Sequence, residues 1–336
     1  MTQNLSPSFE NMLGPRLDAA ADVLQLSAFY HSHPGQPTPW EKSFTRPAYL
    51  SYFLPLNYAR LRSVFRQVRR LLPPEQIQEI WDFGSGPGTT HWVLEDEEWL
   101  PERPLFCVES SHQAIQVHKD LQAQRQQLRF TPKFKAGPPR PGQQALAIFS
   151  YSFLELQPDA RFLQDFEHVL IVEPSTREAG RSLMEWRQRL QGEGFHVLAP
   201  CTHAQPCPLL TRSNRDWCHM RMAFAAPDWF LRQEDHLPMK NRTLTYSYLL
   251  LSRKTPPTSR DAIHNPARVV GDTLEERGKT RQMICRGPER EFLSWLHRHG
   301  EPPRIPHGAL VTGLETCEVK GGELRVGPES QLQWSE

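Results

Sequence analysis

A glycine-rich stretch, EIWDFGSGPGTTHW (residues 79–92), constrains the fold of this 336-residue chain more than any other feature. Residues 79–83 predict a short buried strand, and a helix is expected to begin near Thr89. Between them lie Gly84, Gly86 and Gly88. Glycines at such a turn permit tight backbone geometry and let N–H groups approach a ligand at a helix N-terminus. The stretch therefore predicts the strand, loop and helix of a ligand-binding α/β domain, the alternative being an ordinary glycine turn.

The spacing of these glycines distinguishes two cofactor classes. Gly-x-Gly-x-Gly preceded by an acid is typical of S-adenosylmethionine sites, whereas dinucleotide loops more often read Gly-x-Gly-x-x-Gly. A second apolar strand, over 105–109, ends in an acid whose distance from the loop suits hydrogen bonds from two ribose hydroxyls. We therefore expect S-adenosylmethionine to be bound by Asp82, Gly84, Ser85, Gly86, Gly88 and Glu109.

Strands and helices alternate from Gln78 onward, which favours a parallel, doubly wound, Rossmann-like sheet. Apolar runs over 145–151 and 168–174 predict two further strands, and 196–199 with 244–252 predict an antiparallel edge pair. Ser150 and Tyr151 then emerge at the carboxyl edge of the sheet, where α/β proteins bind ligands, and are added to the candidate cofactor residues.

The segment from Tyr52 to Leu72 predicts an amphipathic helix. Its apolar face carries Leu61, Val64, Phe65, Val68 and Leu72, and its opposite face carries Arg60, Arg66, Arg69 and Arg70. Two interpretations stay open for the arginine face: a solvated surface on a packed helix, or a surface that contacts RNA phosphates.

Proline-rich joints near residues 34–39, 73, 138 and 256 divide the chain. We expect an N-terminal helical region at 1–75, a Rossmann-like domain at 76–254 with an insertion at 199–220, and a small β-rich C-terminal appendage at 255–336. Short strands are expected in the appendage at 267–270 and 323–326.

Charge and hydropathy set limits on partners and location. Lys plus Arg number 39 and Asp plus Glu 38, so a nucleic-acid signal must be local. No apolar run of about 18 residues occurs, which argues against a membrane span. The stretch MTQNLSPSFENML has neither secretory nor transit-peptide character, and we expect a cytoplasmic monomer.

Three of the six cysteines, Cys201, Cys207 and Cys218, lie in one polar stretch. In a reducing compartment such a cluster indicates metal ligands more than disulfides, although free buried thiols are the alternative. Zinc and iron–sulfur sites both usually have about four protein ligands, so the three clustered cysteines leave one ligand to be found elsewhere. Cys285 is the best candidate, with His203 and His219 as competitors; Cys107 is expected in the core and Cys317 has no assigned role.

The chain resembles a known family in several motifs that occur in matching order. These are WDFGSGPGTTHW, SYSFLEL, LIVEPSTREAG, APCTHAQPCPL followed by DWCH, ARVVGD and ICRGP. Together they look like the methyltransferase-like small-ribosomal-subunit assembly factors, often called Rsm-twenty-two, over about Tyr49 to Pro288. The resemblance implies a class I methyltransferase-like α/β fold, S-adenosylmethionine binding, association with small-subunit rRNA or the pre-ribosomal small subunit, and a [4Fe-4S] cluster held by Cys201, Cys207, Cys218 and Cys285, with zinc as the alternative.

The chain departs from the family pattern at two positions. Ser175 replaces a glycine in a Glu-Pro-Gly-Thr turn, and Met220 replaces a phenylalanine. The turn after the strand at 145–151 also lacks the Asn/Asp-Pro-Pro-aromatic pattern of amine N-methylation, and no cysteine nucleophile is near, so no catalytic residue is assigned. Three functions remain: an rRNA methyltransferase, a non-catalytic assembly factor, or a small-molecule methyltransferase with a structural zinc site.

Overall fold

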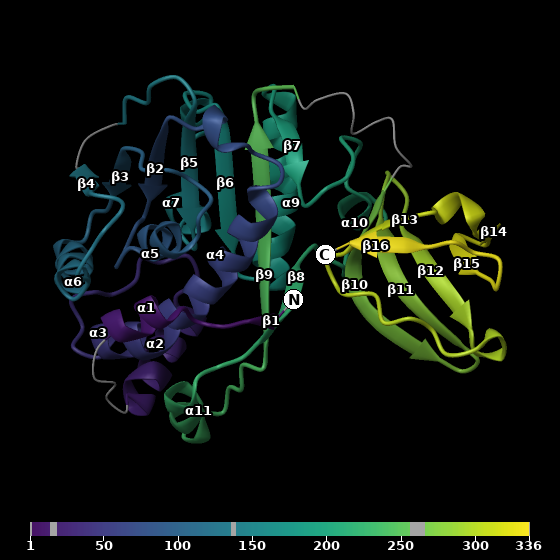
Figure 1. Cartoon of the computed structure of the whole chain (residues 1–336), viewed down its shortest axis with the longest axis horizontal. Helices are drawn as coiled ribbons and strands as arrows, with labels where there is room; N and C mark the ends of the chain where they lie inside the picture. The colour runs from purple at the N-terminus through teal and green to yellow at the C-terminus, as the bar shows by residue number, and fades with distance from the viewer. Residues whose placement is uncertain (1, 14–18, 136–138, 256–265, 336) are drawn as a thin grey trace. The chain divides into compact units, whose positions relative to one another are not determined.

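The computed structural model describes residues 2–13, 19–135, 139–255 and 266–335 (Figure 1). Its internal contacts define two compact units. Unit 1 comprises Met1–Glu173 and Met222–Leu244, and unit 2 comprises Pro174–Arg221 and Thr245–Glu336. The proline joints near Pro138 and Pro256 lie outside the described residues. The division into 1–75, 76–254 and 255–336 stays a prediction.

Five parallel strands form the central sheet of unit 1, in the spatial order β4-β3-β2-β5-β6. They are β2 (Glu79–Phe83), β3 (Leu105–Val108), β4 (Pro132–Lys135), β5 (Ala145–Ser150) and β6 (His168–Glu173). All of β6 and nearly all of β5 are buried, as expected for strands covered on both faces. The predicted α/β sheet is therefore confirmed, and β4 is a strand that the sequence did not indicate.

Helices connect these strands. The helices are α5 (Thr89–Asp96), α6 (His112–Ala123), α7 (Phe153–Leu156) and α8 (Ala160–Leu163). The side chain of Ser111 caps α6 by accepting a hydrogen bond from the Ala114 amide. Unit 1 also contains a short parallel pair, β1 (Thr2–Gln3) against β8 (Met220–Phe224), and helix α11 (Asp228–Asp235).

The N-terminal part of unit 1 is helical, as predicted. It contains α1 (Pro7–Met12), α2 (Ala20–Ser32), α3 (Thr45–Ala48), a π-helical turn η1 (Tyr49–Phe53), α4 (Leu54–Val68) and a 3₁₀ turn η2 (Pro74–Gln76). The predicted apolar face of α4 is fully buried. The helix is shorter than the expected Tyr52 to Leu72, because it ends at Val68. Arg69 and Arg70 therefore lie beyond its last turn.

Unit 2 begins with helix α9 (Arg177–Gly192), which Thr176 caps by accepting a hydrogen bond from the Ala179 amide. Strand β7 (His196–Ala199) then pairs antiparallel with β9 (Thr243–Ser252), which confirms the predicted pair. The loop after β7 carries the cysteines and includes the short helix α10 (Pro208–Thr211).

The C-terminal part of unit 2 is a seven-stranded sheet in the order β14-β15-β12-β11-β10-β13-β16. Its strands are β10 (Ala267–Glu276), β11 (Lys279–Cys285), β12 (Glu291–Leu296), β13 (Leu310–Thr312), β14 (Glu318–Lys320), β15 (Glu323–Val326) and β16 (Gln333–Ser335). Its 3₁₀ turns are η4 (His297–His299) and η5 (Leu314–Thr316). The predicted strands at 267–270 and 323–326 are confirmed within β10 and β15. Among the described residues, no helix is both long and apolar enough to cross a bilayer.

Candidate functional site

The three glycines after β2 all have left-handed backbone angles, with φ of +64° at Gly84, +50° at Gly86 and +89° at Gly88. Two of them are also crowded by the protein itself. A Cβ on Gly84 would lie 2.5 Å from the Cβ of Ser152, and one on Gly88 would lie 2.4 Å from Nε2 of His118. At Gly86 the nearest side-chain atom is 3.9 Å away, on Trp40. Gly86 is therefore the position where a ligand has room to approach the backbone.

Glu109 follows β3 and holds the loop in place. One carboxylate oxygen accepts a hydrogen bond from the Gly86 amide at 2.9 Å, and the other accepts from the Ser111 amide at 2.8 Å. A carboxylate has about four lone-pair sites, so these two bonds leave acceptor capacity on Glu109. The predicted acid thus lies beside the glycine loop, as the sequence order suggested.

Asp82 is 1% exposed at the end of β2. Its Oδ1 accepts a hydrogen bond from the Thr90 hydroxyl at 2.8 Å. Burial raises the pKa of Asp82 to about 7, against that hydrogen bond and with a smaller contribution from the charge of Glu109. Three buried oxygens near this loop and strand edge have no hydrogen-bond partner among the described residues: Oδ2 of Asp82, Oγ of Ser85 and Oγ of Ser150. Unused buried polar atoms fit a site that is completed by a polar ligand.

Tyr151 leaves β5 with φ of +60°, an unusual angle for a bulky residue and one that marks functional sites more often than chance. Its amide donates to the Val172 carbonyl at 2.8 Å. The guanidinium of Arg60 lies 6.0 Å from the centre of the Tyr151 ring. Arg60, predicted as an RNA contact, thus lies beside a predicted cofactor residue.

Three residues that the sequence did not indicate also belong to this region. Trp40 packs against Tyr49, with ring centres 4.9 Å apart, and Tyr49 is the first residue of the π-helical turn. Burial, with the nearby charge of Glu109, raises the pKa of Glu155 to about 7. A π-helical turn is frequently a functional feature, but its sequence YLSYF carries no recognisable signal.

The turn after β5 is occupied by structural hydrogen bonds. Ser152 donates its hydroxyl to the Phe83 carbonyl at 2.5 Å, and Glu173 accepts from the amides of Phe153 and Leu154 at 2.7 and 3.2 Å. Burial raises the pKa of Glu173 to about 8. These hydrogen bonds fix the turn, and the carboxyl of Glu155, whose pKa is raised to about 7, lies in α7 directly after it.

The predicted arginine face is divided in the structure. Arg66 donates to the buried carboxylate of Glu97 at 3.0–3.1 Å, together with Arg62 at 2.5 Å. Arg69 is 4.0 Å from the same carboxylate, and Arg70 is exposed. Arg66 is therefore part of a buried ion pair, and Arg69 and Arg70 are the more accessible cations.

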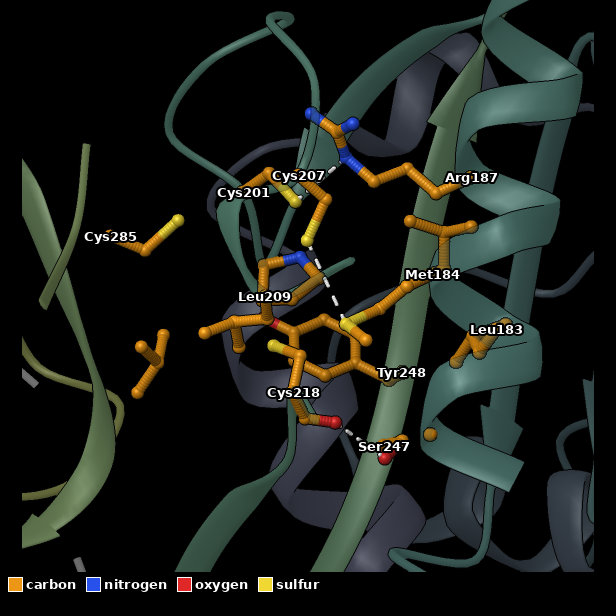
Figure 2. Close-up of a pocket in the computed structure, with 14 residues that line it drawn as sticks. Leu183, Met184, Arg187, Cys201, Cys207, Leu209, Cys218, Ser247, Tyr248 and Cys285 are labelled. Carbon is orange, nitrogen blue, oxygen red and sulfur yellow. Dashed lines mark hydrogen bonds between the residues drawn. The ribbon is translucent and has the colours of Figure 1, made fainter. Parts of the chain in front are cut away.

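The four predicted cysteine ligands all line one cavity of unit 2 (Figure 2). Cys201 follows β7, Cys207 precedes α10, Cys218 precedes β8 and Cys285 ends β11. The cavity volume is about 30 Å³. Its other lining residues are Gly180, Leu183, Met184, Arg187, Pro200, Leu209, Ser247, Tyr248, Leu249 and Val270. Cys107 is buried in β3 as predicted, and Cys317 lies outside this cavity's lining.

Polar groups surround these sulfurs. Nε of Arg187 donates to Sγ of Cys201 at 3.0 Å, and Nε2 of His203 is 3.3 Å from Sγ of Cys285. Burial, followed by the charge of neighbouring cysteines, raises the pKa values of Cys207, Cys218 and Cys285. Burial therefore disfavours thiolates at these three positions unless a positive charge compensates for it.

The spacing of the sulfurs differs from that of a closed zinc site. A single zinc ion with four Zn–S bonds of about 2.3 Å requires sulfurs about 3.8 Å apart. Among the described cysteines, no three sulfurs lie within 4.8 Å of one another. The four sulfurs therefore do not form a closed tetrahedral set in this structure.

A family model and one curated relative match this chain. A family model described as "Mitochondrial small ribosomal subunit Rsm22" matches residues 44–301. The human "Ribosome assembly protein METTL17, mitochondrial" is 27% identical over 206 residues, which cover 51% of this chain and 43% of that protein. The chain therefore spans less than half the length of this curated relative.

Solved structures of methyltransferases are also similar. The plantazolicin methyltransferase BamL is matched over 70% of this chain and 97% of its own, with 13% identity and a TM-score of 0.35. TrmK of M. capricolum is matched over 57% of this chain and 69% of its own, with 9% identity and a TM-score of 0.33. Independently of these similarities, the predicted doubly wound, Rossmann-like α/β fold is confirmed by the strand order β4-β3-β2-β5-β6 and the glycine loop after β2.

Proposed function

We propose that this chain, which belongs to the family described as mitochondrial small ribosomal subunit Rsm22, is an assembly factor for the small ribosomal subunit. The observation that carries the proposal is the extent of the family match, because residues 44–301 include both the glycine loop and the four-cysteine cavity. The name of the human relative, a ribosome assembly protein, supports the same role. The proposed partner is small-subunit rRNA or the pre-ribosomal small subunit.

S-adenosylmethionine is the cofactor we propose for unit 1. The free space at Gly86, the remaining acceptor capacity of Glu109 and the unpartnered oxygens of Asp82, Ser85 and Ser150 support it. When bound, this cofactor supplies an electrophilic methyl group. Glu109 would accept hydrogen bonds from the ribose hydroxyls, and Gly86 would let the backbone approach the ligand closely.

A [4Fe-4S] cluster is the centre we propose for unit 2, with Cys201, Cys207, Cys218 and Cys285 as ligands. The convergence of these cysteines on one cavity supports the cluster. When bound, a cluster supplies a redox-sensitive cross-link. The chain's own residues fix the cysteine loop, because Arg187 and Thr202 tie it to α9 and to the Cys285 carbonyl.

Methyl transfer is a second candidate activity. The glycine loop and the Glu109 carboxylate beside it favour this activity, because these are the residues expected to bind a methyl donor. The turn after β5 favours a non-catalytic factor, because its polar groups are committed to backbone hydrogen bonds. A small-molecule methyltransferase with a zinc site is the third candidate, and the family match favours it less because the family is described by its ribosomal subunit.

The assembly role is tested in two strains, one that expresses the tagged protein and one that lacks the gene. Ultraviolet crosslinking in the first should enrich small-subunit rRNA on the protein. Sucrose gradients of the second should show a deficit of mature small subunits. Mapping of rRNA methylation then separates the two activities, because a missing methyl mark supports catalysis and an unchanged pattern supports the assembly role alone. Normal subunit levels with no rRNA enrichment would reject both.

The cluster is tested by anaerobic purification and metal analysis. We expect about four irons and four sulfides per chain and broad absorption near roughly 400 nm. Cys285→Ser should remove most of the iron, whereas Cys317→Ser is the matched control, since that residue is equally buried elsewhere in unit 2. Stoichiometric zinc without iron would contradict the proposal.

Cofactor binding is tested by calorimetry on the full chain. Glu109→Gln keeps the side-chain shape but removes the charge, and should weaken S-adenosylmethionine binding by about 1–3 kcal/mol. Glu102→Gln, an exposed carboxylate in the same unit, is the control. Absence of binding by the natural chain would contradict this part of the proposal and leave the cluster untouched.

A further inference from the structure

Three metal-binding side chains far apart in the sequence converge in unit 2, outside the cysteine cavity. They are His219 before β8, Asp272 in β10 and His307 before β13. One ligand atom from each lies within 4.8 Å of the others. The rings of His219 and His307 stack with centres 5.2 Å apart and an angle of 30°.

The ring nitrogens of His219 and His307 make few hydrogen bonds to the protein. Nδ1 of His219 and both ring nitrogens of His307 are buried and make no well-formed hydrogen bond among the described residues, although the backbones of Trp217 and Val270 lie near the two rings. Buried histidine nitrogens usually find a good partner, and leaving one unpaired costs about 1–3 kcal/mol.

Surrounding hydrogen bonds hold the three residues in place. The Gly308 amide donates to the Val269 carbonyl at 2.9 Å, which fixes the His307 loop to β10. The register of β10 against β11 shifts between Val269 and Thr273, which sets the direction of Asp272. The Ser247 hydroxyl donates to the Cys218 carbonyl at 2.8 Å, next to His219.

We propose that His219, Asp272 and His307 form a binding site for one divalent transition-metal ion, with zinc as the best match. Two neutral imidazoles and one carboxylate are a donor set that zinc accepts, with bonds of about 2.0–2.2 Å and a fourth position open to water. Hard ions such as magnesium and calcium prefer oxygen ligands and fit poorly. The ion cross-links the His307 loop, β10 and the segment before β8.

One nearby charge acts against a cation. Nη1 of Arg221 lies 3.1 Å from Oδ1 of Asp272. Both side chains are about half exposed, so this pair is weak, and Oδ2 stays available as a ligand. Metal binding and the Arg221 contact therefore compete only in part, and removal of Arg221 should strengthen the site.

The test uses Co²⁺ as a spectroscopic substitute for zinc on the full chain with its cysteine site loaded. Nitrogen and oxygen ligands give weak visible bands, whereas thiolate ligands add intense near-ultraviolet charge transfer, so this site is distinguished from the cysteines. We expect one Co²⁺ per chain with visible bands alone. His307→Ala and Asp272→Asn should each weaken binding by about tenfold or more, with His299→Ala, an exposed histidine of the same unit, as control.

Arg221→Ala keeps the proposal testable if a histidine variant fails to fold. It leaves all three ligands intact and should tighten Co²⁺ binding about two- to tenfold. Affinity for Co²⁺ that is unchanged in both His307→Ala and Asp272→Asn, or bands that show thiolate ligation only, would overturn the site. These results are independent of rRNA binding, S-adenosylmethionine binding and iron content.

Discussion

Arg187 and Cys201 form a buried contact, with Nε of Arg187 3.0 Å from Sγ of Cys201. Arg187 is 2% exposed, and its Nη2 also donates to the carbonyls of His203 and Gln205 at 2.8 and 3.1 Å. Its charge lowers the pKa values of Cys207 and Cys285, although burial raises them by more. One side chain of α9 thus shapes the cysteine loop and favours its thiolates.

Replacement of Arg187 tests both roles. Arg187→Met should lower the free energy of unfolding by about 1–3 kcal/mol, because the half-buried His203 carbonyl and the more exposed Gln205 carbonyl lose a donor. It should also slow alkylation of the metal-free thiols near pH 8. Urea denaturation and iodoacetamide kinetics measure the two effects. Arg189→Met, which changes an exposed arginine of the same helix, should leave both near their natural values.

Glu97 provides a second prediction, in unit 1. Its buried carboxylate is paired with Arg62 and Arg66, so Arg66→Glu leaves it facing a like charge. We expect a loss of about 2–4 kcal/mol in unfolding free energy. Arg70→Glu, at an exposed position, should change stability by about 0.5 kcal/mol or less. Equal losses in both variants, measured by urea denaturation, would contradict the structural role of Arg66.

This ion pair bears on RNA binding. Because Arg66→Glu is expected to destabilise the fold, a lower RNA affinity in that variant would not report on a phosphate contact. Reversal of both Arg69 and Arg70 is the informative variant, and a flatter salt dependence of RNA binding is its expected result.

The sequence predicted the features whose residues follow one another closely along the chain. The strand and glycine loop at 79–88, and the acid after β3, could be predicted because each step follows the last within about 30 residues. The role of Arg66 could not, because its partner Glu97 lies 31 residues away and helical periodicity does not indicate which cation faces it.

Convergence in space was harder to predict than local structure. Cys285 was predicted as the best candidate for the fourth ligand, with His203 and His219 as competitors, and the family resemblance implied the same four cysteines. The trio of His219, Asp272 and His307 was not predicted as a group, because strand pairing in unit 2 brings these residues together. Trp40 and Tyr49 were missed beside the glycine loop for the same reason.

Asp82 makes the stability of the protein depend on pH. Because its pKa in the folded state, about 7, exceeds the ordinary value of 3.8, ionisation of Asp82 opposes folding. Protonated Asp82 therefore favours the folded state. Its contribution to the free energy of unfolding is fully present below about pH 4 and is lost as the pH rises through about 7. Asp82→Asn keeps an oxygen that accepts from Thr90, and should be more stable than the natural chain at pH 8 by up to about 4 kcal/mol.

The measurement compares urea denaturation of the two proteins at pH 5 and pH 8. The advantage of Asp82→Asn should grow between these values. Asp120→Asn is a control of opposite sign, because a hydrogen bond from Gln116 lowers the pKa of Asp120. A difference in unfolding free energy between the two proteins that does not change with pH would show that the pKa of Asp82 is not raised in the folded state.

Gly86 and Gly88 should respond differently to the same substitution. Gly88→Ala brings a methyl group to 2.4 Å from Nε2 of His118, a buried ring that is hydrogen-bonded to His91 at 2.9 Å, so we expect a loss of about 3 kcal/mol or more in stability. Gly86→Ala meets no such contact and should cost only the strain of its left-handed backbone, about 1–2 kcal/mol. Gly35→Ala, with φ of +76° and open space around it, measures that strain alone.

The two variants separate folding from ligand binding. Gly86→Ala should fold and yet bind S-adenosylmethionine about tenfold more weakly or worse, because its methyl group occupies the space through which the ligand approaches the backbone. Calorimetry on Gly86→Ala and Gly35→Ala, after urea denaturation confirms that both are folded, makes the comparison. Natural affinity in Gly86→Ala would mean that the cofactor does not lie against this loop, since no other described feature of the loop leaves a ligand this much room.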